Sequence, residues 1–337
     1  MFDLLEKLCT ANGISGNEES ICSVIRDEML RYTDNVYIDH NNNVIASIGD
    51  TSKHNIMLDA HLDQIGFVVT YIDDNGFLKV ASCGGMDMRV VNDTRFNVLT
   101  ESGELTAVAC CLPPHLADGG EDKAPDKNEI YLDTGLSAEK VRELVSPGDP
   151  VAYDITPARL LNNRFTCCST DNRASCAVLM RVAELINKNP VSSGVTFAFT
   201  SQEETYGKGA MTAAFSIEPD EAISVDVSFA LQKGVSASQS GSLAGGGMIC
   251  ISPVLSKQMS RKLIELAKQH DIPYQLEVTG GITGTNADKI SVTKSGIPTA
   301  LVSVPQRNMH TGAEIISLDD IESTAQLIYE YINTVNW

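Results

Sequence analysis

Apolar positions along this chain follow two spacings, and the change between them divides the sequence into three stretches. In residues 172–188 the apolar side chains recur at helical intervals, whereas "GVTFAFT" at 194–200 is a continuous apolar run as long as a core strand. Helical and strand-like segments alternate in this way over residues 1–66 and again over residues 155–337. The alternation predicts an α/β domain with a mixed sheet sandwiched by helices.

Residues 67–154 lack that alternation. They consist of short β-type runs such as "FLKVAS" and "LTAVACCL", separated by turn sequences such as "DDNG", with one short helix expected at "SAEKVRELV". This pattern is typical of a small all-β barrel. We therefore expect a barrel-like domain of residues 67–154, inserted into an α/β domain made of residues 1–66 and 155–337.

Seven side chains that could carry chemistry end or follow the predicted core strands. In α/β sheets, binding sites form beyond the carboxyl ends of the strands, so residues from distant segments meet there. Two of the seven are imidazoles and five are carboxylates: His61, Asp63, Asp171, Glu203, Glu204, Asp226 and His310. Imidazoles and carboxylates are common ligands of zinc and other divalent metals in proteins.

Each of these residues also has an ordinary structural interpretation. A single histidine such as His61 is more often hydrogen-bonded in a core, and Asp171 could simply cap the helix that follows it. An adjacent pair such as Glu203 and Glu204 is common on solvated surfaces. Asp226 differs because it lies in an apolar run, where an unpaired buried carboxylate is costly. The argument for a site therefore depends on all of them falling at strand ends.

The set fits a site for two metal ions. One carboxylate can bridge two cations, and two cations a few Å apart can bind a water molecule and a carbonyl oxygen. Asp171 would be the bridge. The first metal would take His61 and Asp226, and the second would take Glu204 and His310.

Two carboxylates remain outside that ligand set. Glu203 would lie uncoordinated beside the water molecule, where a general base is needed. Asp63, two residues after His61, could accept the second imidazole N–H and fix the tautomer. Glu203 and Glu204 can serve one site if the chain leaves the extended conformation beyond the strand end.

The segments that carry these residues resemble the tetrahedral (TET) aminopeptidases, which are two-metal peptidases of the glutamyl and deblocking aminopeptidase type. The matching segments are "DAHLDQIGFVV", "STDNRASCAVL", "TSQEETYGKGA", "VDVSFA" and "VPQRNMHTGAEI". The resemblance runs nearly from end to end and implies the same ligand and base assignments. It also implies aminopeptidase activity on short peptides, and a hollow dodecamer of six dimers in which the β-insert makes the dimer contact.

The metal and the substrate are less constrained. Zinc is the metal we expect, with cobalt or manganese as alternatives, because all three accept nitrogen and oxygen ligands. The preferred N-terminal residue of the substrate does not follow from the sequence. Lys208, Arg307 and Thr285 are candidates for the substrate-binding lining.

Composition and charge limit the kinds of binding partner and the cellular location that we expect. The formal net charge of −19 argues against nucleic acid, because phosphate binding needs clustered Lys and Arg. No stretch has the length and apolar character of a membrane span, and no secretory signal pattern is present. The nine cysteines are an odd number without a C-x-x-C motif, which favours reduced thiols and a cytoplasmic protein.

Two other classes of function compete with a peptidase. Paired carboxylates also serve glycoside hydrolases, but aromatic residues make up only 6% of the chain and its single Trp is Trp337, which leaves little for sugar stacking. A catalytically silent scaffold is the second alternative, and retention of the whole ligand set argues against it. Chelator-sensitive peptide hydrolysis would separate the three.

Overall fold

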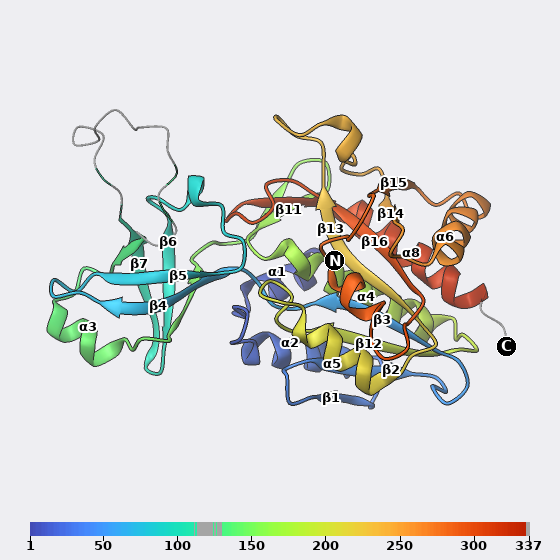
Figure 1. The fold of residues 1–337 in the computed structure, drawn as a ribbon, viewed down its shortest axis with the longest axis horizontal. Coiled ribbons are helices and arrows are strands. Elements are labelled where there is room, and N and C mark those ends of the chain that lie inside the picture. Colours follow the sequence, from blue (N-terminus) through green and yellow to red (C-terminus); the bar gives the residue numbers. More distant parts are fainter. Residues whose placement is uncertain (111, 113–123, 125, 127–129, 335–337) are drawn as a thin grey trace.

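The computed structural model describes residues 1–110, 112, 124, 126 and 130–334 of the 337-residue chain. The chain forms a large mixed sheet covered by helices and, beside it, a closed β-barrel (Figure 1). Residues 113–123, in the middle of the predicted β-insert, lie outside the described residues. Within the described part of the chain, no helix is both long enough and apolar enough to cross a membrane.

Eight strands make up the large sheet. Their order across the sheet is β1 (Val36–Ile38), β2 (Val44–Ile48), β12 (Gly194–Thr200), β3 (Asn55–His61), β13 (Glu221–Phe229), β16 (Thr299–Gln306), β14 (Gly247–Ile251) and β15 (Tyr274–Val278). The first two strands form the hairpin at the amino-terminal edge, and β15 is the opposite edge.

The centre of the sheet is parallel and buried on both faces. Strand β3 pairs in parallel with β12 and β13, and β13 pairs in parallel with β16. Every residue of β3, β12 and β16 is buried, which is why these strands read as near-continuous apolar runs. Strand β2 pairs antiparallel with β12, and β14 pairs antiparallel with β16, so the sheet is mixed, as predicted. The parallel strands bring their carboxyl ends to one edge of the sheet.

Helices cover both faces of the sheet, which confirms the predicted sandwich. One face carries α1 (Phe2–Thr10), α2 (Glu19–Met29), α4 (Thr170–Lys188), α6 (Lys257–Gln269) and α8 (Leu318–Thr334), and the other carries α5 (Lys208–Ile217) and α7 (Asn286–Ile290). Met57 and Ala198 pack against α5 and α7, whereas the alternate strand residues Leu58 and Phe197 pack in the larger cluster with α4. The alternation follows from the two-residue period of a strand.

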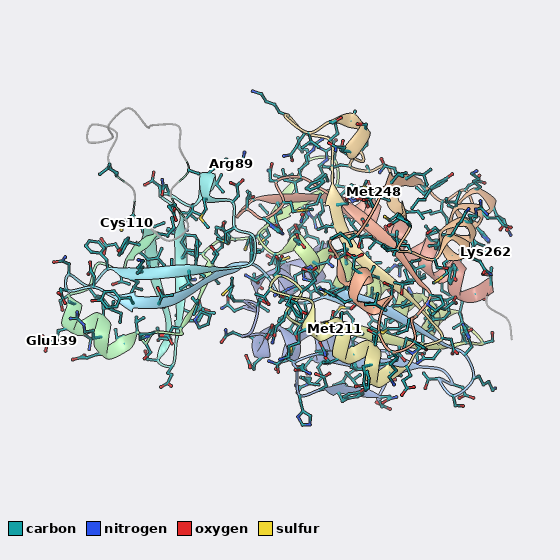
Figure 2. All side chains as sticks on the ribbon, in the orientation of Figure 1. Arg89, Cys110, Glu139, Met211, Met248 and Lys262 are labelled. Atoms are coloured by element: carbon teal, nitrogen blue, oxygen red, sulfur yellow. The ribbon has the colours of Figure 1, made fainter. Side chains whose placement is uncertain are left out.

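Six strands close the barrel, with one helix across it. They are β4 (Gly66–Ile72), β5 (Leu78–Cys83), β8 (Tyr131–Asp133), β7 (Gly103–Ala109), β6 (Arg95–Thr100) and β9 (Pro150–Tyr153), with α3 (Ala138–Leu144) and a short 3-10 helix η1 (Met88–Val90). The Phe96 ring lies 5.3 Å from Phe67 and 4.9 Å from Tyr153, so aromatic side chains fill the interior. Figure 2 labels side chains of this part and of the sheet body: Arg89, Cys110, Glu139, Met211, Met248 and Lys262.

In the part of residues 67–154 that the structure describes, the all-β character and the single α-helix agree with the sequence prediction. The division into two domains after residue 66 and after residue 154 stays a prediction.

A small third sheet joins two segments that are distant in sequence. It contains β10 (Ala158–Leu160), β11 (Arg164–Cys167) and β17 (Glu314–Ser317). Apart from this sheet, another 3-10 helix, η3 (Ala237–Gln239), follows β13. Strand β11 leads into α4, and β17 follows the loop after β16. Pairing of Cys167 with Glu314 therefore brings the start of α4 beside that loop.

Candidate active site

The seven predicted site residues converge at the carboxyl edge of the parallel strands. His61 ends β3, and Asp226 lies within β13 rather than after it. Asp171 lies at the start of α4, where the backbone angles of Asp171 and Asn172 are not helical and the peptide bond between them is cis. Asp171 is therefore presented from a turn that leads into the helix, and not from the helix itself.

The two adjacent glutamates lie in the turn after β12. Gln202 has a left-handed φ of 55°, so the chain leaves the extended conformation just before Glu203. Glu203 Oε2 lies 3.9 Å from His61 Nε2, and Glu204 Oε2 lies 3.6 Å from His310 Nε2. Neighbouring residues of a strand would point to opposite faces, so this turn is what lets both carboxylates reach one site.

Asp171 lies at the centre of the group. Its Oδ1 is 3.2 Å from His61 Nε2, and its Oδ2 is 3.4 Å from His310 Nε2. Each oxygen of one carboxylate thus faces a different imidazole. Asp226 Oδ1 lies 3.7 Å from His61 Nε2.

Both imidazoles are oriented by a carbonyl oxygen on their other nitrogen. His61 Nδ1 lies 3.2 Å from the carbonyl oxygen of Asp63, and His310 Nδ1 lies 2.9 Å from that of Gly85. A carbonyl can only accept, so Nδ1 must carry the hydrogen in each ring. In the neutral ring, that tautomer leaves the lone pair of Nε2 facing the site. Gly85 follows β5, so the barrel segment takes part in positioning His310.

The Asp63 side chain acts mainly on the glutamate turn. Its carboxylate is fully buried and accepts the backbone N–H groups of Glu203 at 3.0 Å and Glu204 at 3.2 Å. The prediction gave this side chain the second N–H of His61. The backbone carbonyl oxygen of Asp63 is the closer partner of His61 Nδ1, and the side-chain Oδ1 of Asp63 lies 3.5 Å from the same nitrogen. Asp63 therefore couples the end of β3 to the turn after β12.

One buried carboxylate at the site was not predicted. Glu314 Oε2 accepts the Asp171 N–H at 3.0 Å and the Thr170 hydroxyl at 3.0 Å, and its Oε1 accepts the His310 N–H at 3.1 Å. Burial, together with the charge of Asp171, raises the pKa of Glu314 to about 8. Glu314 holds the backbone of two site residues whose segments are far apart in sequence. The only sequence signal is its place four residues after His310.

Burial and the neighbouring charges shift the pKa values of the carboxylates at the site. Burial raises the pKa of Glu203 to about 7, and the charge of His61 offsets this only in part. Burial likewise raises the pKa of Glu204, with repulsion from Asp171, and that of Asp226, both well above the usual range. Burial also disfavours the charged form of Asp171, but hydrogen bonds with the two imidazoles lower its pKa overall.

The imidazoles respond to the same charges in the opposite sense. Burial by itself lowers the pKa of His61, but its contacts with Asp171 and Asp63 raise the value well above normal. The pKa of His310 rises to about 10, because the hydrogen bond to Asp171 and the charge of Glu204 outweigh burial. No Lys or Arg is found among the described residues that line the site. The group therefore has the charge and the chemistry of a site that binds cations.

Among the described residues, three sets of donor atoms are close enough to hold a metal ion. Within each set the atoms lie within 4.8 Å of one another, and the sets are His61, Asp171 and Asp226; Asp171, Glu204 and His310; and His61, Glu203 and Glu204. The first two sets share Asp171, in the arrangement that the ligand count predicted. Mixed imidazole and carboxylate donors suit zinc and similar divalent metals.

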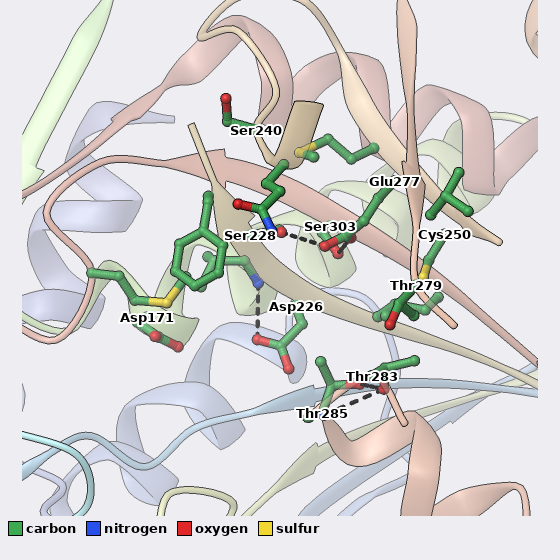
Figure 3. Close-up of a pocket in the computed structure, with 18 of the residues that line it drawn as sticks. Asp171, Asp226, Ser228, Ser240, Cys250, Glu277, Thr279, Thr283, Thr285 and Ser303 are labelled. Carbon is green, nitrogen blue, oxygen red and sulfur yellow. Dashed lines mark hydrogen bonds between the residues drawn. The ribbon is translucent and has the colours of Figure 1, made fainter. Parts of the chain in front are cut away.

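The site opens into a cavity of about 590 Å³ (Figure 3). Its wall includes the ends of β13, β14 and β15, the loop 283–285 and the η3 segment. Of the three predicted substrate-binding residues, Thr285 lines this cavity and Lys208 and Arg307 do not. Lys208 lies exposed at the start of α5, and Arg307 donates from Nε to the Leu231 carbonyl at 2.9 Å.

Comparison with known proteins defines the class. The family model of the M42 glutamyl aminopeptidases matches residues 42–327, and the chain belongs to this family. It is 29% identical to the lysyl aminopeptidase of Pyrococcus furiosus over 331 residues, covering 97% of this chain and 95% of that protein. The chain is therefore an aminopeptidase, a hydrolase.

Solved structures agree with that assignment. Aminopeptidase APDkam598 from the archaeon Desulfurococcus kamchatkensis superposes with a TM-score of 0.93 at 30% identity, over 99% of this chain and 95% of that one. The TET1 peptidase of Pyrococcus horikoshii, described as able to assemble into a tetrahedron or a large octahedral shell, gives 0.88 at 29% identity over 99% of each chain. The resemblance drawn from the sequence to the TET aminopeptidases is confirmed.

Proposed function

We propose that this aminopeptidase removes N-terminal residues from short peptides at a site that binds two divalent metal ions, with Glu203 as general base. The observation that carries the proposal is the position of Asp171, whose two oxygens face His61 at 3.2 Å and His310 at 3.4 Å. Asp171 would be shared by both metals. His61 and Asp226 would complete one set of ligands, and Glu204 and His310 the other.

Two divalent ions supply Lewis-acid stabilisation of a carbonyl oxygen and make a water molecule more acidic. The chain's own residues do the rest. Glu203 takes the proton from the attacking water and passes it to the leaving amine. Two cations beside Glu203 would lower the pKa of its carboxyl group, but they would also make the attacking water more acidic, so the proton transfer stays favourable. Asp63 keeps Glu203 in place by accepting its backbone N–H.

The substrate class is only partly defined by the relatives. The family is named for glutamyl aminopeptidases, whereas the Pyrococcus furiosus relative is named a lysyl aminopeptidase. The names therefore leave open which N-terminal side chain this chain prefers. Zinc is the expected metal, and cobalt or manganese would suit the same donors. We also propose that the barrel, residues 67–154, is a separate domain that mediates dimerisation, and that the dimers assemble into a dodecamer.

Paired substitutions test the roles of the two glutamates. Glu203→Gln is expected to retain two metal ions per chain and to lose about 10²- to 10⁴-fold in kcat, which is the usual contribution of a general base. Glu204→Gln is expected to lose or weaken one metal, with activity partly restored by excess metal. Native mass spectrometry gives metal content, and hydrolysis of aminoacyl p-nitroanilides gives turnover.

The opposite pattern would reverse the assignment. If Glu203→Gln lost a metal and Glu204→Gln kept both, Glu204 would be the base. If a chelator left peptide hydrolysis unchanged, the two-metal proposal would fail as a whole.

A further inference from the structure

A fifth carboxylate lines the same cavity, apart from Asp171, Glu203, Glu204 and Asp226. Glu277 lies on β15, opposite Cys250 of β14. Met248, two residues before Cys250, lies opposite Ser303 of β16, and Ser303 lies opposite Asp226 of β13. Residues that are directly paired share one face of a sheet, as do residues two apart on one strand. Glu277 therefore projects from the same face as Asp226, three strands away.

The Glu277 side chain reaches back across the sheet towards the site. Its Oε1 accepts the Ser228 hydroxyl at 2.6 Å, and its Oε2 accepts the Ser303 hydroxyl at 3.2 Å (Figure 3). Ser228 lies two residues beyond Asp226 on β13, which corresponds to about 7 Å along the strand. The Glu277 carboxylate thus lies about one side-chain length from the metal-binding group, within the same cavity.

Glu277 has no cationic partner among the residues that the structure describes. Its hydrogen bonds come from two neutral hydroxyl groups, and no ion pair includes it. The described lining of the cavity contains no Lys or Arg, and its only groups that can carry positive charge are His61 and His310. Both imidazoles are engaged with Asp171. A half-buried carboxylate in this position lacks a counter-charge from the chain itself.

Apolar side chains lie among the polar groups of the cavity that Glu277 lines. Met248, Cys250, Leu276 and Leu301 line the same cavity. Apolar side chains next to a carboxylate match a ligand side chain with an aliphatic stem and a cationic end. Among the amino acids, lysine and arginine have that form.

We propose that this cavity receives the side chain of the substrate's N-terminal residue, and that Glu277 selects lysine or arginine there. The inference rests on the proposed function, because it places the scissile bond beside Glu203 and Asp171. A bound basic side chain would give Glu277 the counter-charge that the chain does not provide. Ser228 and Ser303 would hold the carboxylate in place for that contact.

The substrate's free α-amine is a second cation that a carboxylate could bind. The α-amine is one carbon from the scissile carbonyl and so lies beside the candidate metal ligands, whereas Glu277 is bonded to Ser228, about 7 Å further along β13 than Asp226. The geometry therefore assigns Glu277 to the end of the side chain. The two roles differ in a measurable way, because recognition of the α-amine would act on every substrate equally.

The test compares wild type with Glu277→Gln on lysyl-, arginyl-, leucyl- and glutamyl-p-nitroanilide, with metal saturating. Glutamine keeps an acceptor for the serine hydroxyls and removes the charge. We expect wild type to prefer the basic substrates, and Glu277→Gln to lose on the order of 10- to 100-fold in kcat/KM for them while leucyl turnover stays within about twofold. Glu265→Gln, an exposed glutamate on α6 outside the cavity, is the matched control and should change nothing.

A measurement on wild type alone guards against a variant that does not fold. Free lysine and norleucine, which share an unbranched four-carbon chain and differ in the charged end, are compared as competitive inhibitors. Lysine is expected to bind at least about tenfold more tightly, because only lysine can pair with Glu277.

The outcomes separate this inference from the function on which it rests. If no aminoacyl substrate is hydrolysed with any metal, the proposed function fails. If wild type hydrolyses leucyl or glutamyl substrates best, or binds norleucine as tightly as lysine, the side-chain inference fails while the function stands. An equal loss on all four substrates in Glu277→Gln would instead assign the carboxylate to the α-amine.

Discussion

At the scale of single residues, the geometry of the site depends on carboxylates that accept backbone N–H groups as well as on the candidate metal ligands. Asp63 accepts two N–H groups of the glutamate turn, and Glu314 accepts those of Asp171 and His310. Charge-assisted bonds of this kind are stronger than neutral ones. The positions of the candidate ligands therefore depend on groups that would touch no metal.

A third buried carboxylate of this kind gives a pH prediction. Glu18 is fully buried and accepts the Gly16 N–H at 2.6 Å, while its other oxygen has no hydrogen-bond partner among the described residues. Burial, only partly offset by that N–H, raises the pKa of Glu18 from 4.5 to about 7. The folded state thus keeps a proton that the unfolded state has lost, and stability should fall as pH rises from 4.5 to about 7.

Glu18→Gln should remove this slope. Between pH 5.5 and 8.5 the stability difference between variant and wild type should change by about 2 kcal/mol in favour of the variant. Urea unfolding of both proteins at the two pH values, with the same metal concentration, measures it. The other titrating groups are common to both proteins and cancel in the comparison. A difference that stays constant with pH would mean that Glu18 is ionised in the folded protein.

The sequence indicated the residues whose side-chain chemistry suggests metal binding, but not those that reach the site only through long-range packing. His61, Asp171 and Glu204 stood out because imidazoles and carboxylates at strand ends suggest metal ligands. Glu314 and Glu277 gave no such signal. Glu314 reaches Asp171 only because β17 pairs with β11, and Glu277 faces the cavity only through the register of three strands. Long-range pairing of this kind does not show in local sequence patterns.

At the scale of elements, one buried arginine ties two helices together. Arg173 on α4 is fully buried, and its Nη1 donates to the carbonyls of Leu8 at 2.6 Å and Ala11 at 3.2 Å. Its Nη2 donates to Gln64 Oε1 at 3.1 Å. The last carbonyls of a helix lack partners within the helix, so Arg173 satisfies the end of α1 from α4.

Arg173→Met should lower the free energy of unfolding by about 3 kcal/mol, because it leaves buried carbonyls without donors. Lys188→Met on the same helix, where the side chain is mostly exposed, should cost less than about 1 kcal/mol. Urea midpoints at one protein and metal concentration allow the comparison. Equal effects of the two substitutions would show that the Arg173 contacts contribute little to stability.

Element types were easier to predict than their arrangement. Continuous apolar runs and helical spacing are local, and they gave the sandwich and the β-insert directly. The contact of Gly85 with His310 was not predictable. A side chain at position 85 would approach His310 Nδ1 to 2.8 Å, so glycine allows the barrel segment to lie against the site. That constraint appears only when the two segments are placed together.

At the scale of the whole molecule, charge and assembly act against each other. Each chain carries a formal net charge of −19, so copies of it repel one another over roughly the Debye length. Two divalent ions per chain would remove only part of that charge. The six described strands close the barrel and leave no free edge among them, so contacts that these strands make with another chain must come from side chains. Tyr71 and Val108, 56% and 41% exposed, are apolar side chains that its surface offers.

The proposed dodecamer should therefore form more readily as salt increases. At about 0.15 M salt with metal, light scattering should give twelve times the chain mass of 36.3 kDa, and at about 0.01 M salt with a chelator it should give smaller species, dimers among them. Screening weakens repulsion between like charges and leaves apolar contacts intact, which sets the direction. Dissociation on adding salt would instead show that ion pairs hold the interface, and the mass of a single chain under every condition would contradict assembly altogether.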